Sequence, residues 1–356
     1  MRIVVTGASG NLGTALLRAL SGRGHDLHAV ARRPPDPAAV VSSNVTWSSL
    51  DLSETACEPD LDGLVASAGA VVNLAWAFQP MRRPAYLQRA SVGIVERVAR
   101  AALRTGRTHL VHVSSVAAYS PRRSERRVDE GWPREGIPGA TYSRLKVEAE
   151  RSLERLTSAA GADDRVTVVR PCLVGQYDAG GPMLRCGAPA PFPGALVGHL
   201  PVVPVDERFG LQLVHSDDVA DALTRVVEQH AVGRFDLAAE PVLRGADFAD
   251  ALHARPIRLS QKAARATMSA LWRAHLSPLD PGWVDMAQQA PWVAGARARD
   301  ELGWKPLHSA RDVLHDLVRG MAAGAGAGTG ALRARTVADG IRRAASGGSV
   351  ARRSLT

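Results

Sequence analysis

The first thirteen residues constrain the fold more than any other part of the chain. Residues 3–5 form a short β-branched run that predicts a buried strand. Gly7, Gly10 and Gly13 follow at a spacing of three, and an apolar pattern of helical period comes next. A strand that turns through glycines into a helix presents free backbone N–H groups and the positive end of the helix dipole. This order therefore predicts a binding site for a pyrophosphate group.

Length and composition are those of a globular protein. A chain of 356 residues can bury a sizeable core, and its hydrophobic fraction of 46% is ordinary for such proteins. Cys57, Cys172 and Cys186 are widely spaced and form no CxxC pair, which favours a reducing compartment without disulfides. The first strand starts at residue 2 and no uncharged stretch reaches about 18 residues. We therefore expect a cytoplasmic location and no membrane partner.

The net charge of +9 is unevenly distributed. Residues 320–356 hold six arginines and one acid, a balance of 6 − 1 = +5, which leaves 9 − 5 = +4 for the first 319 residues. No basic stripe interleaved with aromatic residues appears in that larger part, so we expect no nucleic-acid partner. No cluster of His, Asp and Glu has the spacing of a metal site, and we expect no metal.

Strand and helix signals alternate through the first half of the chain, which predicts an α/β fold with a doubly wound parallel sheet. Residues 1–171 are expected to form this Rossmann domain. Residues 172–318 mainly form a smaller C-terminal substrate-binding lobe, with 213–238 returning to the sheet. Residues 319–356 are expected to be a flexible basic tail rich in Gly, Ala and Arg, with a short helix near 331–345. The predicted strands are residues 3–5, 27–31, 45–47, 70–74, 110–113 and 166–169.

Three residues carry the predicted chemistry. Tyr142 and Lys146 lie four apart at the start of a predicted helix, so both project from one face. A nearby ammonium group favours the phenolate and lowers the pKa of a tyrosine. Ser115 follows the fifth strand, at the sheet edge where doubly wound folds bind ligands. We expect Ser115 to bond the substrate oxygen and the neighbouring Ser114 to cap the following turn.

These features together resemble the extended short-chain dehydrogenase/reductases, the NAD(P)-dependent epimerase/dehydratase family. The resemblance covers about residues 1–318 and is specific for the family but not for the substrate. It rests on motifs that occur in the family's order: Thr6-Gly7-x-x-Gly10-x-x-Gly13, Asn73-Leu74-Ala75, Ser114-Ser115-x-x-x-Tyr119, Tyr142-x-x-x-Lys146, Arg170-Pro171, Val214-His215-Ser216-Asp217-Asp218-Val219-Ala220 and Leu302-Gly303-Trp304-Lys305-Pro306.

The resemblance implies a role for each matching residue. Tyr142 would be the acid/base, Lys146 would lower its pKa and hold the nicotinamide ribose, and Ser115 would orient the substrate. Asp51 and Leu52 would hold the adenine. The remaining residues expected at the cofactor are Gly7, Gly10, Asn11, Leu12, Gly13, Arg32, Arg33, Leu74, Ala75, Trp76, Ser91, Pro171 and Cys172.

This chain departs from the family pattern at positions that bear on the choice of cofactor and on the substrate pocket. Members that prefer NAD place a carboxylate at the end of the second strand, whereas this chain has Ala31 followed by Arg32 and Arg33. A guanidinium suits a 2′-phosphate, so NADP(H) is favoured over NAD. Ser91 stands where many members carry an asparagine. Trp76 and Phe78 follow the fourth strand and are expected to form an apolar wall of the substrate pocket.

The leading functional hypothesis is an oxidoreductase that moves hydride between nicotinamide and a carbonyl or hydroxyl carbon of a small molecule. The alternative is a nucleotide-sugar epimerase with tightly bound NAD. Dehydration is disfavoured because Val116 and Ala117, rather than acids, follow Ser115. A cofactor-sensing regulator is disfavoured because the tyrosine and the lysine are both present. The resemblance also suggests a homodimer built on the helices at 92–103 and 141–156.

Overall fold

Seven parallel strands form one sheet in the order β10-β6-β5-β4-β1-β2-β3. The computed structural model describes residues 1–35, 44–79, 81–189, 192–206, 208–336, 338, 340–342 and 345. The strand order reverses beside β1, as in a doubly wound sheet, and this confirms the predicted fold class. The strands are β1 Arg2–Thr6, β2 Asp26–Ala31, β3 Val45–Ser49, β4 Ala70–Asn73, β5 His109–Val113, β6 Val166–Pro171 and β10 Gly233–Leu237.

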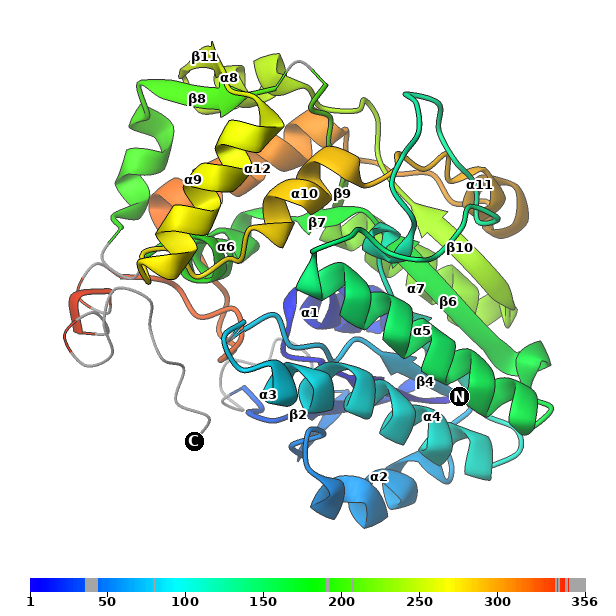
Figure 1. Ribbon diagram of the computed structural model, residues 1–356. Coiled ribbons are helices and arrows are strands. Elements are labelled where there is room, and N and C mark those ends of the chain that lie inside the picture. The colour runs from blue at the N-terminus through cyan, green and yellow to red at the C-terminus, as the bar shows by residue number, and fades with distance from the viewer. Residues whose placement is uncertain are drawn as a thin grey trace.

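Helices cover both faces of this sheet (Figure 1). Alternation along β1 decides which layer each side chain joins: Ile3 and Val5 pack with α1 and α7, whereas Val4 packs with α2, α4 and α5. Both layers are buried, so the central strands β1 and β4 are buried on their two sides, whereas the edge strand β3 is partly exposed. The helices of this domain are α1 Asn11–Leu20, α2 Glu58–Val65, α3 Pro84–Gln88, α4 Ile94–Arg104, α5 Thr141–Ala159 and α7 Ser216–Gln229.

A second lobe lies beyond the carboxyl ends of the strands, at the upper left of Figure 1. Two small sheets pair β8 with β11 and β7 with β9. Of the stretch expected to return to the main sheet, β10 does so, whereas β9 pairs with β7 instead. The elements are β7 Leu173–Gly175, α6 Gly180–Gly187, β8 Val202–Val205, β9 Leu213–His215, α8 Gly245–Ala251, β11 Arg255–Arg258, α9 Gln261–Arg273, α10 Gly282–Gln289 and α12 Ala310–Ala323. The remaining helix, α11 Ala296–Leu302, packs against β10 and α7 of the main sheet, at the right of Figure 1.

The C-terminal part differs from the flexible tail that composition predicted. The expected boundary at residue 319 lies inside α12. Residues 324–336, which we call the C-terminal segment, turn back and pack against α6. Glycine makes a free chain flexible, but in this segment the glycines, which lack a side chain, allow backbone atoms to approach closely. Residues 331–336 are not helical, although helical positions occur among 338–345, and residues 346–356 lie outside the described residues.

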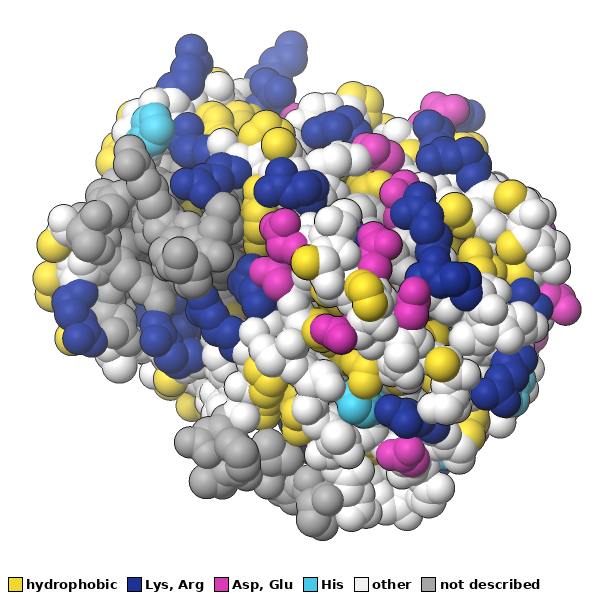
Figure 2. All heavy atoms as spheres, turned by 90° about the horizontal axis from the view of Figure 1, so that it is seen from below, with side chains coloured by type: hydrophobic (Ala, Val, Ile, Leu, Met, Phe, Trp, Pro, Cys, Tyr) yellow, Lys and Arg dark blue, Asp and Glu magenta, His cyan; other side chains and the backbone are white. Residues whose placement is uncertain are grey.

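The surface seen from below interleaves both signs of charge over its right half (Figure 2). Basic side chains there alternate with acidic ones instead of joining into one stripe. Among the residues that the structure describes, no helix is both long and apolar enough to cross a membrane. No group of three or more His, Cys, Asp or Glu side chains in the same residues is arranged to hold a metal ion.

Candidate active site

The glycine turn after β1 is packed so closely that two of its glycines leave no space for a side chain. A β-carbon on Gly7, which has a φ of 68°, would lie 2.7 Å from the backbone nitrogen of Ala75. A β-carbon on Gly13 would lie 2.4 Å from the carbonyl oxygen of Ala8. Gly10 differs, because its β-carbon would meet only the Gly7 carbonyl oxygen, at 3.2 Å. The first and third glycines thus allow close packing, whereas the second has one looser contact, to the Gly7 carbonyl oxygen.

Among the residues that the structure describes, no side chain caps the backbone N–H groups at the start of α1. Its N-cap is Gly10, no side chain caps it, and no acidic residue lies in its first turn. By contrast, α12 begins with a capping box in which Ser309 and Asp312 bond each other's backbone N–H groups. The amides at the start of α1 are therefore available to an anion, as a dinucleotide pyrophosphate requires. The protein's own residues fit such a cofactor.

Arg32 lies at the end of β2, beside the predicted ribose position, and two side chains hold it. Its Nη1 atom lies 3.1 Å from the Tyr86 hydroxyl and 3.8 Å from Asp51 Oδ2. Asp51 also accepts hydrogen bonds from the backbone and hydroxyl of Ser53, at 2.9 and 2.7 Å. The adjacent Arg33 is exposed and Leu52 is buried. The guanidinium of Arg32 thus has two side-chain partners, while the side chain stays 45% exposed.

Tyr142, Ser115 and Lys146 come together where β5 ends and α5 begins. The Ser115 hydroxyl lies close enough to Tyr142 to lower the pKa of its phenol. Lys146 is 3% exposed, and its ammonium group donates to the Val113 carbonyl at 3.2 Å. One expectation is corrected here: Ser115, not Ser114, caps the following turn by accepting from the Ala117 N–H at 3.2 Å. A hydroxyl oxygen accepts two bonds and donates one, so this cap leaves Ser115 able to bond a further oxygen.

Three aromatic rings surround Tyr142. Phe78 stacks on it with ring centroids 5.3 Å apart and an interplanar angle of 6°. Trp283 of α10 lies at 5.5 Å and Trp76 meets it edge-on at 6.0 Å. Trp76 also lies under the Lys146 ammonium, whose nitrogen is 3.7 Å from the ring centroid. Trp76 and Phe78 lie where an apolar wall was expected, whereas Trp283 carried no signal in the sequence.

Burial shifts the pKa values of both Tyr142 and Lys146. It raises the pKa of Tyr142, against the lowering effect of the Ser115 hydrogen bond. The sequence had predicted a lowered pKa for Tyr142. The prediction was wrong because the aromatic rings around the phenol exclude water, and because the Lys146 ammonium lies against Trp76. Burial also lowers the pKa of Lys146 to about 7, and the Glu150 carboxylate opposes this shift. Lys146 is therefore poised to gain or lose its proton near neutrality.

A buried ion pair supports the lysine from the next turn of α5. Arg170 donates to both carboxylate oxygens of Glu150, at 2.9 and 2.6 Å, and both side chains are almost fully buried. Burial acts to raise the pKa of Glu150, but the bonds from Arg170 outweigh it and lower this pKa to about 2. Tyr119 donates to Asp236 at 2.9 Å and accepts from Arg170 at 2.8 Å. The spacing Tyr142, Lys146, Glu150 continues one helical face, a signal that sequence analysis could have used.

Most of the other residues expected at the cofactor lie around the same edge of the sheet. Asn11 accepts from Gln176 at 2.6 Å, which links the glycine turn to the second lobe. Ser91 is buried and donates to the Ala77 carbonyl at 3.3 Å, so it steadies the stretch that carries Trp76. Cys172 is buried in the core, where burial raises the pKa of its thiol. Leu74 and Ala75 follow β4, Pro171 ends β6, and Leu12 lies in the first turn of α1.

Two histidines near the carboxyl ends of the strands, His112 and His215, have structural contacts. His215 caps α7 by accepting from the Asp217 N–H at 3.1 Å. His112 is fully buried beside Asn73, at 3.3 Å, and burial lowers its pKa to about 3. His215 is therefore a capping residue and His112 a packed one.

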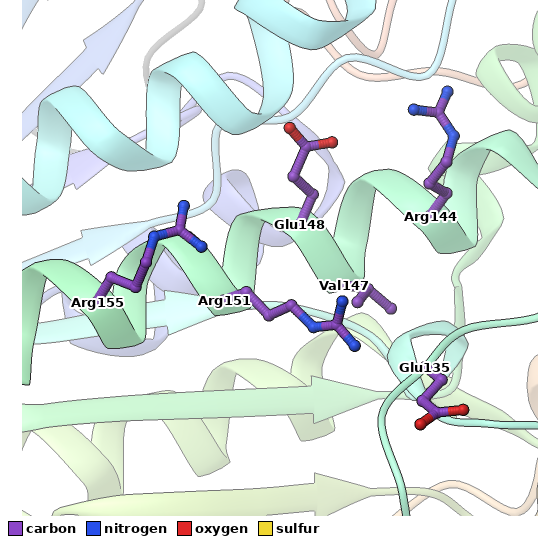
Figure 3. Close-up of a pocket in the computed structure, with 6 residues that line it drawn as sticks. All are labelled: Glu135, Arg144, Val147, Glu148, Arg151 and Arg155. Atoms are coloured by element: carbon purple, nitrogen blue, oxygen red, sulfur yellow. The ribbon is translucent and has the colours of Figure 1, made fainter.

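A surface hollow of about 430 Å³ lies along α5 but is separate from this site (Figure 3). The lining side chains that come from α5 lie on the helix face turned away from Tyr142 and Lys146, because a helix turns by 100° per residue, and Glu135 comes from the loop before α5. The lining residues are Glu135, Arg144, Val147, Glu148, Arg151 and Arg155. The hollow lies on a helix of the suggested dimer seam, and the homodimer stays a prediction.

The fold and the site define a nicotinamide-dinucleotide enzyme with a Rossmann domain. Comparison with known proteins gives the family: the chain belongs to the NAD dependent epimerase/dehydratase family, whose model matches residues 3–237. It is therefore an NAD(P)-dependent oxidoreductase or epimerase.

Relatives and solved structures agree with this membership. The chain is 29% identical over 338 residues to the 3-diazoavenalumate denitrifying reductase of a Streptomyces species, covering 88% of this chain and 99% of the relative. It is 31% identical over 173 residues to a 4-hydroxy-2-methyl-3-oxo-4-farnesyl-3,4-dihydroquinoline-1-oxide ketoreductase of Stigmatella aurantiaca, covering 48% and 49% of the two chains. The Thermus thermophilus UDP-glucose 4-epimerase complex with NAD superposes with a TM-score of 0.67 at 16% identity, covering 90% and 99%.

Proposed function

We propose that this enzyme is an NADP(H)-dependent reductase of a small carbonyl compound that carries a planar ring. One observation carries the proposal: the phenol of Tyr142 lies against Phe78, Trp283 and Trp76, with Ser115 at its hydroxyl. Aromatic rings stack on planar substrates and exclude water from the reacting oxygen. The two curated relatives named above are a reductase and a ketoreductase, which supports the direction.

In this mechanism the residues of the chain bind, orient and move one proton. The N-terminus of α1 and the glycine turn hold the pyrophosphate, and Lys146 holds the nicotinamide ribose. Bound nicotinamide supplies or accepts the hydride. Ser115 donates to the substrate oxygen and aligns it with Tyr142. The Tyr142 hydroxyl gives its proton to that oxygen in the reductive direction and removes it in the oxidative direction.

The decisive test is Tyr142→Phe, which keeps the ring and removes the proton. We expect kcat to fall by about 10²- to 10⁴-fold while the Kd for NADPH stays unchanged. Tyr177→Phe in the second lobe is the matched control and should leave kcat as it is. Loss of cofactor binding with Tyr142→Phe, or an unchanged kcat, would contradict the assignment.

The substrate class has its own test. Phe78→Leu and Trp283→Leu keep apolar volume but remove the rings, so KM should rise about two- to tenfold for ring-bearing ketones and stay constant for short aliphatic ones. An equal change in KM for both kinds of ketone would contradict the preference for a planar ring. The proposed hydride and proton transfer would not be affected by that result.

The cofactor preference depends on Arg32. Charge-assisted bonds from a positioned guanidinium to the 2′-phosphate should make NADPH bind more tightly than NADH. We expect Arg32→Ala to reduce the NADPH/NADH ratio of kcat/KM by about 10- to 100-fold, with little change for NADH. An unchanged ratio would show that the arginine does not read the phosphate.

The alternative, a nucleotide-sugar epimerase with tightly bound NAD, is favoured by the superposition on a UDP-glucose 4-epimerase. An epimerase must return the hydride to the same substrate and so retains its cofactor. The absorbance spectrum of the purified protein separates the two proposals. Stoichiometric bound nicotinamide favours the epimerase, whereas a protein that needs added NADPH favours the reductase.

A further inference from the structure

The C-terminal segment, residues 324–336, forms a closed loop after α12. Gly324 ends α12 in the left-handed conformation, with a φ of 62°. The backbone N–H of Arg335 then bonds the Gly324 carbonyl at 2.8 Å, and that of Ala327 bonds the Leu332 carbonyl at 2.7 Å. These bonds bring the two ends of the segment together, so its middle, residues 328–331, projects as a tip.

The base of the segment is fixed to α6 and to the loop after it. The Gly181 N–H donates to the Ala325 carbonyl at 2.8 Å. Arg185 donates to the carbonyls of Ala331 and Ala334, and Arg335 donates to those of Pro189 and Phe192, the last two at 2.9 Å. The Leu332 side chain is only 3% exposed. Charge-assisted bonds to backbone carbonyls and a buried leucine make this a docked element.

The tip reaches the glycine turn that receives the pyrophosphate. The Thr329 hydroxyl donates to the Ser9 carbonyl at 2.7 Å and accepts from the Leu332 N–H at 3.2 Å. Ser9 lies between Gly7 and Gly10. In Figure 1 the orange-red chain after α12 passes the end of the sheet where α1 begins.

The same tip also approaches the ribose side of the site. A β-carbon at Gly330 would lie 3.8 Å from the β-carbon of Arg33, which follows Arg32 after β2. The tip therefore spans the two parts of a dinucleotide site that the fold places at the ends of β1 and β2. Thr329, which lies 320 residues from Ser9 in the sequence, thus contacts the glycine turn directly.

We propose that the C-terminal segment is a wall of the dinucleotide site, in which Thr329 is a positioning residue that holds the glycine turn and slows release of the cofactor. The proposal rests on the proposed function for the presence of NADP(H) in this site. A turn held in its binding conformation loses less freedom when the ligand binds, and a covering loop must move before the ligand leaves. The held turn therefore lowers the Kd of the cofactor, and the covering loop lowers its dissociation rate.

The test compares two truncations of the full chain. One ends at Ala323 and lacks the segment; its matched control ends at Thr336 and lacks only the residues beyond the segment, including four arginines. NADPH dissociation rate and Kd are measured by stopped-flow and equilibrium fluorescence. We expect both to rise about tenfold in the shorter chain and to stay unchanged in the control. Equal values in the two truncations, or tighter binding by the shorter one, would overturn the proposal.

Point variants keep the test valid if the shorter chain does not fold. Thr329→Val removes both hydrogen bonds of the hydroxyl, to Ser9 and to Leu332, and should raise the NADPH dissociation rate about three- to tenfold. Thr329→Ser, which keeps the hydroxyl, should restore the rate of the unmodified chain. An unchanged rate with Thr329→Val would overturn the role of Thr329. If Tyr142→Phe abolishes turnover while these variants bind NADPH normally, the segment proposal fails and the function stands. If the full chain binds no nicotinamide dinucleotide, both fail.

Discussion

The chain has two glycine-rich stretches, residues 7–13 and 320–330, and they differ in what surrounds each glycine. In the first, a β-carbon on Gly13 would lie 2.4 Å from the Ala8 carbonyl oxygen, between a strand and a helix of the core. In the second, a β-carbon on Gly326 would lie 2.2 Å from the Leu332 carbonyl oxygen, inside a loop docked on the surface. Both stretches need glycine for close approach. Only in the first stretch would an added side chain force residues of the core to move.

This difference predicts unequal costs for the same substitution, because a docked loop can lift away whereas a core turn cannot. Glycine content alone therefore does not distinguish a flexible linker from a tightly packed turn. The three substitutions below, ordered from the largest expected effect to the smallest, test this comparison.

Gly7→Ala should have the largest effect. It places a β-carbon 2.7 Å from the Ala75 nitrogen at a residue with a φ of 68°. We expect a loss of about 2–5 kcal/mol in the free energy of unfolding, measured by chemical denaturation. Gly22→Ala, at a φ of 79° with open space around it, is the matched control and should cost about 1–2 kcal/mol. Equal costs would show that the contact with Ala75 is unimportant.

Gly181→Ala should have an intermediate effect. Its β-carbon would meet the Ala325 carbonyl oxygen at 2.4 Å and displace the C-terminal segment from α6. We expect a loss of about 1 kcal/mol in the free energy of unfolding and faster cleavage by trypsin after Arg333 and Arg335, followed by mass spectrometry. Gly187→Ala in the same helix meets only Leu279, at 4.0 Å, and should change neither. Cleavage at equal rates in the two variants would contradict the docking.

Gly326→Ala should have the smallest effect on stability. Strain inside the segment can be relieved by local opening, so we expect a change below about 1 kcal/mol in the free energy of unfolding. The strain should appear in binding, as an increase of about two- to fivefold in the Kd for NADPH measured by fluorescence. Gly63→Ala in α2, where a β-carbon has open space, provides the control. A loss of stability as large as that of Gly7→Ala would remove the distinction between the two stretches.

Sequence reasoning succeeded where a local pattern and a fold rule agreed. The alternation of strand and helix signals placed β1, β2, β4, β5 and β6 within one or two residues, because buried parallel strands are short apolar runs. It brought Ser115, Tyr142 and Lys146 to one place, because the ends of parallel strands share one edge of the sheet. It did not find Trp283, since α10 reaches Tyr142 only through packing of the second lobe.

Sequence by itself determined the parallel sheet, the glycine turn and the Tyr142–Lys146 pair, because each depends on periodicity or spacing within a few residues. The tertiary structure decided the direction of the Tyr142 pKa, which burial among aromatic rings raises. It also decided the place of residues 324–336, whose partners Ser9 and Arg185 lie 320 and 146 residues away in the chain. Such contacts depend on shape complementarity between distant surfaces, which no local pattern encodes.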